Sequence, residues 1–147
     1  MANYTIRQFQ GEVGKWIARV ETGLDDVIRE FAKAVHADLV RNSPVDTGRF
    51  RANWQITANV IPMFALNEYD NTGEKTIATG KRIINALPLG RGGAVTSIHF
   101  SNMLIYANAL EYGHSKQAPA GVVGIINLRL RSYMANAIKA SRLKNGV

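Results

Sequence analysis

The apolar pattern in the first third of the chain is the feature that most constrains the fold. Large apolar residues recur there, mostly three or four positions apart, at Phe9, Val13, Trp16, Ile17, Val20, Leu24, Val27, Ile28, Phe31, Val35 and Leu39. This spacing matches the period of about 3.6 residues of an amphipathic helix. Thr22 and Gly23 are expected to bend or divide the helix, because glycine is unfavourable in a helix interior. Pro44 lacks an amide N–H, so the helix should end by residue 42.

The apolar period changes to two just after this proline. The alternating apolar residues are Phe50, Ala52, Trp54, Ile56, Ala58 and Val60. Alternation of this kind predicts a strand with one buried face over residues 50–60. A second strand is predicted over residues 94–100, a short helix over 76–87 and a terminal helix over 122–142. Residues 61–74, 88–93 and 113–121 carry turn-forming residues and are predicted to be loops.

These elements predict one α+β domain spanning residues 1–147, a length that suits a single core. Residues 1–42 would form a helical N-terminal arm, residues 43–121 a strand-rich core with loops, and residues 122–142 a C-terminal helix. The long N-terminal amphipathic helix and the C-terminal helix should pack on a small, mainly antiparallel β-sheet. No apolar run approaches the roughly 18 residues of a membrane-spanning helix, so no membrane span is expected.

The charge of the chain indicates what kind of partner it attracts. Eighteen Lys and Arg residues face 11 Asp and Glu residues, which gives a net charge of +7. This charge favours an acidic partner such as nucleic acid or an acidic protein surface. The chain has no cysteine, which excludes disulfides and thiolate metal sites. No cofactor is expected.

Asp46 lies in the sequence Asp-Thr-Gly, which is also the signature of aspartic proteases. In those enzymes two such carboxylates share a proton, so this single copy would have to act in a dimer. The nearby Arg49 and Arg51 would instead favour two ionised carboxylates. A turn accounts for the same residues: Asp46 would accept the amide N–H two residues on, and Gly48 would supply a positive φ. We therefore predict a turn and no catalytic residue.

Glu111 and His114 have the spacing of half of a di-iron motif. A full site needs two copies on helices plus further carboxylates, but the sequence has no second copy, and Gly113 lies between Glu111 and His114. We therefore predict no metal site, and a structural or interface role for His114.

Two segments together resemble a known family. Residues 43–54, SPVDTGRFRANW, resemble the Pro-Val-Asp-Thr-Gly segment of tailed-bacteriophage neck and tail-completion (head–tail joining) proteins. Residues 106–121, YANALEYGHSKQAPAG, resemble their later Tyr-Ala and Glu-Tyr-Gly segment. We call these segments motif 1 and motif 2. The matching positions are Pro44, Asp46, Thr47, Gly48 and Arg51 in motif 1, and Tyr106, Ala107, Glu111, Tyr112 and Gly113 in motif 2.

The resemblance implies a non-enzymatic virion structural protein, assembled in the host bacterial cytoplasm. It would form a six-fold or twelve-fold ring of its own copies at the head–tail junction, between the capsid portal and the tail, in contact with other neck and tail proteins. A tail terminator or another minor tail protein is an alternative. A small basic nucleic-acid-binding protein is an alternative from another class.

The candidate interface residues come from the two motifs and their immediate neighbours. They are Pro44, Asp46, Thr47, Gly48, Arg49, Arg51, Tyr106, Glu111, Tyr112, Gly113 and His114. One hypothesis is that Arg49 or Arg51 pairs with Glu111, within one subunit or across two. Another is that part of the positive charge lines a ring lumen and contacts packaged DNA non-specifically.

Overall fold

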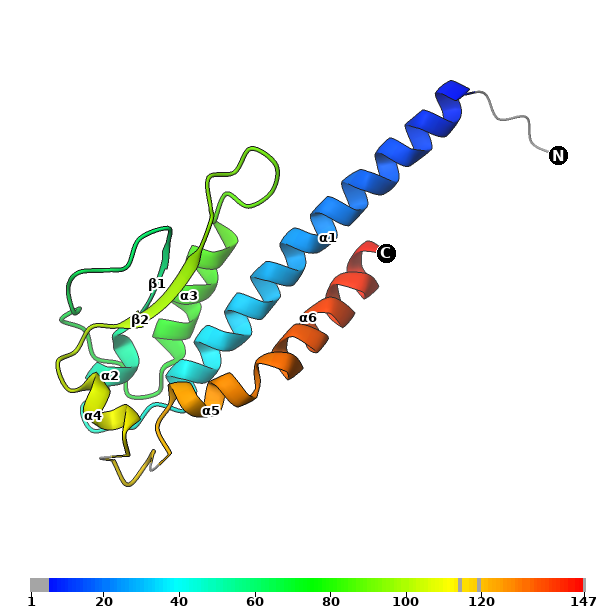
Figure 1. Cartoon of the computed structure of the whole chain (residues 1–147). Helices are drawn as coiled ribbons and strands as arrows, with labels where there is room; N and C mark the ends of the chain where they lie inside the picture. Colours follow the sequence, from blue (N-terminus) through cyan, green and yellow to red (C-terminus); the bar gives the residue numbers. More distant parts are fainter. Residues whose placement is uncertain (1–5, 114, 119, 147) are drawn as a thin grey trace.

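The computed structural model describes residues 6–113, 115–118 and 120–146, and it confirms the α+β fold (Figure 1). The elements in chain order are α1 (Ile6–Arg41), α2 (Arg49–Ala52), β1 (Trp54–Ala58), α3 (Glu74–Asn85), β2 (Ile98–Asn102), α4 (Ala107–Glu111), α5 (Val123–Leu128) and α6 (Leu130–Asn145). The two strands and α3 lie on one side of α1, and α6 runs back along its other side.

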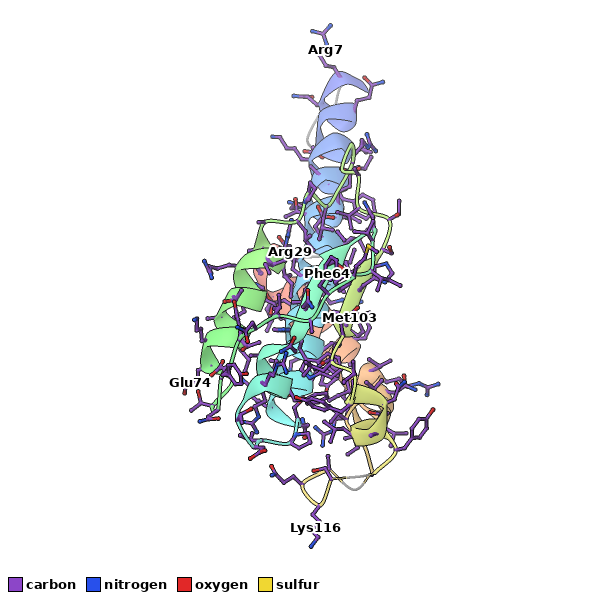
Figure 2. All side chains as sticks on the ribbon, turned by 90° about the vertical axis from the view of Figure 1, so that its left-hand side faces the viewer. Arg7, Arg29, Phe64, Glu74, Met103 and Lys116 are labelled. Carbon is purple, nitrogen blue, oxygen red and sulfur yellow. The ribbon has the colours of Figure 1, made fainter. Side chains whose placement is uncertain are left out.

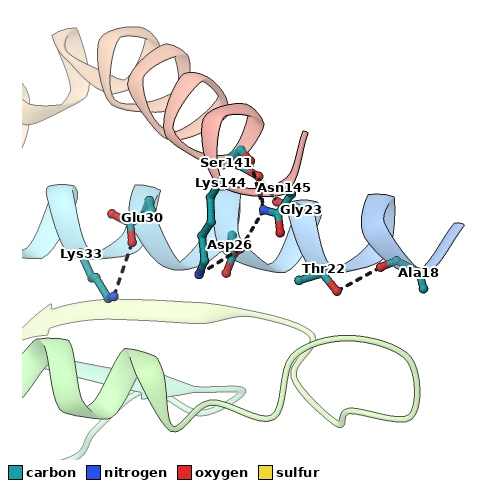
Figure 3. Close-up of polar contacts among 9 residues, drawn as sticks. All are labelled: Ala18, Thr22, Gly23, Asp26, Glu30, Lys33, Ser141, Lys144 and Asn145. Atoms are coloured by element: carbon teal, nitrogen blue, oxygen red, sulfur yellow. Dashed lines mark hydrogen bonds and ion pairs between the residues drawn. The ribbon is translucent and has the colours of Figure 1, made fainter. Parts of the chain in front are cut away.

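Helix α1 is continuous, so the predicted bend or division at Thr22 and Gly23 is wrong. Gly23 is buried where α6 packs on α1, and the Ser141 hydroxyl donates to its carbonyl oxygen at 2.7 Å (Figure 3). Asp26, one turn further along α1, accepts from the Asn145 amide at 2.9 Å and lies 3.4 Å from the Lys144 ammonium. The glycine therefore marks the place where α6 packs, without interrupting the helix.

The apolar stripe of α1 is buried only in the C-terminal half of the helix. Val35, Leu39 and Val40 are at most 6% exposed. Every residue from 11 to 19 is exposed, and this half extends beyond α6 and the sheet (Figure 1). The first half of the helix, which we call the α1 arm (residues 7–19), therefore lies outside the packed core.

The predicted strand over residues 50–60 begins later and ends earlier than expected. Phe50 and Ala52 are buried as the alternation indicated, but they belong to the one-turn helix α2. The helix forms because the Gly48 carbonyl accepts the amide of Ala52 at 3.1 Å. Strand β1 starts only at Trp54. It ends at Ala58, because the next residue, Asn59, has a left-handed backbone with φ of 69°.

The second strand is also displaced, from residues 94–100 to Ile98–Asn102. It pairs antiparallel with β1, with Trp54 opposite Asn102 and Ala58 opposite Ile98. Residues 94 and 96, which precede β2, bond to the side chain of Asn59. Asn59 Oδ1 accepts the amide of Thr96 at 2.7 Å, and Asn59 Nδ2 donates to the Ala94 carbonyl at 2.7 Å.

Helix α3 spans Glu74–Asn85, two residues earlier than predicted at both ends. Asp70 sets its start, because one carboxylate oxygen accepts the Gly73 amide at 3.0 Å and the other accepts the Thr76 amide at 2.8 Å. Arg29 of α1 binds the other end, donating to the carbonyls of Ile84 at 2.6 Å and Leu87 at 2.9 Å. Both ends of α3 are therefore fixed by side chains.

The terminal helix predicted over residues 122–142 consists of two helices that meet at Arg129. At this break Arg129 lies 3.6 Å from the Asp38 carboxylate, and the Tyr133 hydroxyl donates to the same carboxylate at 2.5 Å. Burial and the neighbouring Asp38 raise the pKa of Tyr133 to about 12, so the hydroxyl keeps its proton. These contacts turn α6 so that it runs along α1.

The core lies around the C-terminal half of α1. Its main cluster includes Val35, Leu39, Val40, Phe50, Trp54, Ile77, Leu104, Val122 and Ile126, and a second cluster contains Ala32, Ile56 and Ile84. His36 is buried beside them, and its Nε2 donates to the Trp54 carbonyl at 3.2 Å. Burial lowers the pKa of His36, so the ring is neutral at pH 7.

Candidate functional site

Motif 1 is the connection between α1 and α2, and most of it is fixed by hydrogen bonds. Ser43 is buried: its hydroxyl donates to the Leu39 carbonyl at 2.6 Å and accepts the indole N–H of Trp54 at 2.7 Å. Gly48 has φ of 84°, as predicted for the turn. Its carbonyl also accepts the amide of Asp70 at 3.0 Å, and a Cβ at Gly48 would lie 2.6 Å from the Asn71 nitrogen. Residue 48 must therefore be glycine for two reasons: its positive φ, and the close approach of the loop that carries Asp70 and Asn71.

Arg51 is a structural residue of motif 1. Its guanidinium donates to the carbonyls of Ser43 at 3.1 Å, Arg41 at 3.1 Å and Asn71 at 2.8 Å. Carbonyls at the end of a helix lack partners within the helix, and a guanidinium there also interacts favourably with the helix dipole. Arg51 thus joins the end of α1 to the loop before α3.

Asp46 does not make the hydrogen bond that the sequence predicted. Its side chain is exposed, and within the described residues its carboxylate has no hydrogen bond or ion pair. The hydroxyl of Thr47 takes the predicted role in the turn, because it accepts the amide of Arg49 at 3.4 Å. Asp46 is therefore available to solvent or to a partner.

Glu111 of motif 2 binds the start of α5 and neither arginine of its own subunit. One carboxylate oxygen accepts the amides of Val122 and Val123, and the other accepts the amide of Gly124, each at 2.8 Å. A carboxylate suits a helix N-terminus, where amides lack partners. The hypothesis that Arg49 or Arg51 pairs with Glu111 within one subunit is therefore wrong.

The fold brings the two motifs side by side, and Gln117 joins them. Its side-chain oxygen accepts the amide of Val45 at 2.8 Å, and its side-chain nitrogen donates to the carbonyl of Val45 at 2.8 Å. The rings of Phe50 and Tyr106 also meet, with centroids 6.3 Å apart. The role of Gln117 was not predicted, because nothing in the local sequence shows that residue 117 returns to residue 45.

A cleft of about 510 Å³ lies between the motifs. It is lined by Pro44, Val45, Asp46, Thr47, Gly48, Arg49, Phe50, Tyr106, Leu110, Ser115, Lys116 and Gln117. The fold thus gathers most of the predicted interface residues of motif 1, with Tyr106 of motif 2, around one hollow. We call it the motif cleft.

The remaining candidates lie apart from this cleft or outside the described residues. Tyr112 is 82% exposed, and Gly113 follows it with φ of 85°. Arg51 and Glu111 serve the fold, as shown above. His114 lies outside the described residues.

The described residues contain no group of three or more His, Cys, Asp or Glu side chains placed to hold a metal ion. None of the helices among them is both long enough and apolar enough to cross a bilayer.

The comparison with known families gives the class of protein. A family model described as "Bacteriophage HK97-gp10, putative tail-component" matches residues 7–113, which include α1 apart from its first residue, α2 to α4, both strands and all of motif 1. The protein is therefore a structural component of a bacteriophage tail. It belongs to the HK97-gp10-like family, which confirms the resemblance to tailed-phage neck and tail-completion proteins. No curated protein and no solved structure matches the chain.

Proposed function

We propose that the protein is a non-enzymatic ring subunit of the virion at the head–tail junction. Copies of the chain would pack around the tail axis, and the ring would connect the capsid portal side to the tail. Membership of a phage tail-component family supports the structural role. The observation that carries the proposal of a ring is the exposed apolar surface of the α1 arm.

The α1 arm presents apolar side chains that stay largely exposed in the part of the subunit that the structure describes. Val13, Trp16 and Ile17 are 38%, 52% and 41% exposed. Trp16 and Ile17 lie three and four positions after Val13, so the three side chains share one face of the helix. An amphipathic helix gains most of its stability by packing this face, and a neighbouring subunit would supply the missing surface.

A second apolar surface lies on the loop after β1. Ile61, Met63 and Phe64 are 60%, 81% and 79% exposed, and Figure 2 shows Phe64 well away from Arg7 at the end of the arm. Two unlike apolar surfaces on one chain suit a head-to-tail contact between copies. Such contacts close into a ring when the rotation between neighbours permits it. A six-fold or twelve-fold ring is the expected form.

The ring is tested with purified full-length protein and two variants of adjacent residues. Native mass spectrometry and negative-stain electron microscopy should show a ring for the wild type. Trp16→Ala should shift the population to smaller species, whereas Lys15→Ala, one position away, should leave the ring intact. A wild type that stays monomeric, or a ring that is indifferent to Trp16→Ala, would contradict the proposal.

The position in the virion is tested by electron microscopy of phage carrying a stop codon in this gene. Filled heads beside separate tails are expected for a protein of the junction. Tails of abnormal length would indicate a tail terminator, and normal infectious virions would overturn the structural role.

We also propose a non-specific contact with packaged DNA. Arg7, Lys15 and Arg19 are exposed on the α1 arm, and Lys139 and Arg142 are exposed on α6. Binding of the purified protein to duplex DNA should weaken steeply as salt rises, because phosphate contacts release counterions. No binding at low salt would remove this part of the proposal.

A further inference from the structure

Arg49, the first residue of α2, is half-buried and lines the motif cleft. Its neighbour Arg51 makes hydrogen bonds to several carbonyls, but the Arg49 side chain makes no hydrogen bond or ion pair within the described residues. Its Nε is shielded from solvent and has no hydrogen-bond partner among the residues that the structure describes. Arg51 is therefore a structural residue, whereas the hydrogen-bond donors of the Arg49 side chain are unused within the described residues.

A partly buried cationic group is unfavourable without an acceptor, and such groups in folded proteins normally have one. The shielded Nε cannot reach a molecule in the cleft, so an acceptor there would have to meet the terminal N–H groups of the guanidinium, which also have no partner within the described residues. The five N–H donors of a guanidinium form a planar fork that matches a carboxylate. The cleft beside it is walled by Phe50 and Tyr106, whose rings offer apolar contact to the stem of an incoming side chain. The arrangement is that of a site for one anionic group on an otherwise apolar stem.

We propose that the motif cleft binds an acidic segment of another virion protein, with one carboxylate held by Arg49. Lys116 adds a second positive charge at the edge of the cleft, at the end of the molecule opposite the α1 arm (Figure 2). The carboxylate of Asp46, which has no hydrogen bond or ion pair within the described residues, lines the same cleft and offers an acceptor to the backbone amides of an extended chain.

The charges and the shape favour an acidic protein segment over the other two occupants. In the proposed ring, copies of the chain contact one another through the α1 arm and the loop after β1, and neither surface lines the motif cleft, so the cleft is left for a different partner. Duplex DNA presents its phosphates on a wide convex surface. Such a surface does not fit into a concave cleft. A single Glu or Asp side chain on a flexible segment can enter it.

The test measures binding of a fluorescein-labelled peptide of alternating Glu and Gly residues to the full-length protein by fluorescence anisotropy. A peptide with Gln in place of Glu serves as the probe control. Arg49→Met keeps an unbranched apolar stem but removes the guanidinium, and Arg131→Met makes the same change at an exposed residue of α6. Arg49→Met should weaken binding of the Glu peptide about tenfold, as expected for a hydrogen-bonded charge. Arg131→Met should leave it unchanged.

The stability of Arg49→Met distinguishes a binding role of Arg49 from a structural role. Because the Arg49 side chain loses no hydrogen bond on replacement, Arg49→Met should leave the urea midpoint unchanged or raise it. A lowered midpoint would show that the side chain supports the fold and would overturn the proposal.

Three other outcomes would overturn the proposal. If Arg131→Met weakened binding of the Glu peptide as much as Arg49→Met does, the binding would depend on net charge alone. Loss of duplex DNA binding in Arg49→Met, with peptide binding kept, would assign the cleft to phosphate. Loss of self-association in Arg49→Met, measured by sedimentation velocity, would assign it to a second copy.

Discussion

Replacement of Glu111 by Gln tests the assignment of this residue as the cap of α5. The change keeps the size of the side chain but exchanges one carboxylate oxygen for an NH₂ group. In the wild type the two oxygens accept three amides at 2.8 Å. In the variant at least one of these amides would face a donor, and the negative charge at the helix N-terminus would be lost.

The size of the effect follows from these contacts. A hydrogen bond to a charged group contributes about 1.5–3 kcal/mol. Loss of a helix N-cap costs about 0.5–2 kcal/mol. These ranges describe the same contacts, so they are not added, and we expect Glu111→Gln to lower the free energy of unfolding by about 2 kcal/mol. With a urea m-value of about 2 kcal/mol/M, the midpoint should fall by about 1 M.

The assay is urea unfolding followed by far-UV circular dichroism at one fixed protein concentration. Glu74→Gln is the matched control, because Glu74 also lies in the first turn of a helix, but its carboxylate has no hydrogen bond or ion pair within the described residues. That control should change the free energy of unfolding by no more than about 0.5 kcal/mol. If both variants had the same midpoint, the reasoning that makes Glu111 a cap would be refuted.

Two further predictions concern α3. Gly80→Ala should destabilise the protein by about 1–3 kcal/mol, because its Cβ would lie 2.3 Å from His36 Nδ1; Gly14→Ala, where a Cβ meets nothing within 4 Å, should stabilise the exposed part of α1. Equal midpoints in urea for these two variants would contradict the packing at Gly80. The second prediction concerns Asp70: its partial burial raises the pKa, but hydrogen bonds from Thr76, Gly73 and Thr72 outweigh that effect, so the net pKa lies below the ordinary 3.8. Because the pKa of Asp70 is lower in the folded state, its ionised carboxylate stabilises the folded protein above about pH 4. This stabilisation is lost as the pH falls through the folded-state pKa. The wild type should therefore exceed Asp70→Asn in stability at pH 6, and the difference should shrink towards pH 3; a difference independent of pH would refute the assignment.

The sequence predicted those parts of the fold that depend on local period and on single backbone constraints. The 3.6-residue pattern located α1, and Pro44 located its end to within a residue or two. Gly48 was predicted to have a positive φ, and it does. The alternation from Phe50 to Ile56 identified buried residues correctly but not their secondary structure, because a single helical turn before a strand can bury the same residues.

The parts that could not be predicted depend on contacts between distant residues. The Glu111 carboxylate accepts the backbone amides at the start of α5, so it does not pair with Arg49 or Arg51. Gln117 reaches Val45 across 72 positions, and no local pattern shows this. The break at Arg129 is fixed by Asp38 of α1 rather than by a proline or glycine nearby. The two unlike roles of Arg49 and Arg51 likewise become visible only when the surrounding carbonyls are placed.

The uninterrupted course of α1 has a mechanical consequence. Its 36 residues span roughly 54 Å at about 1.5 Å per residue. The arm that carries Trp16 and the segment that carries His36 therefore belong to one stiff rod, with no hinge between them. If a neighbouring subunit binds the arm and moves it, the rigid helix transmits this movement to the core. The spacing between subunits and the orientation of each motif cleft would therefore be coupled.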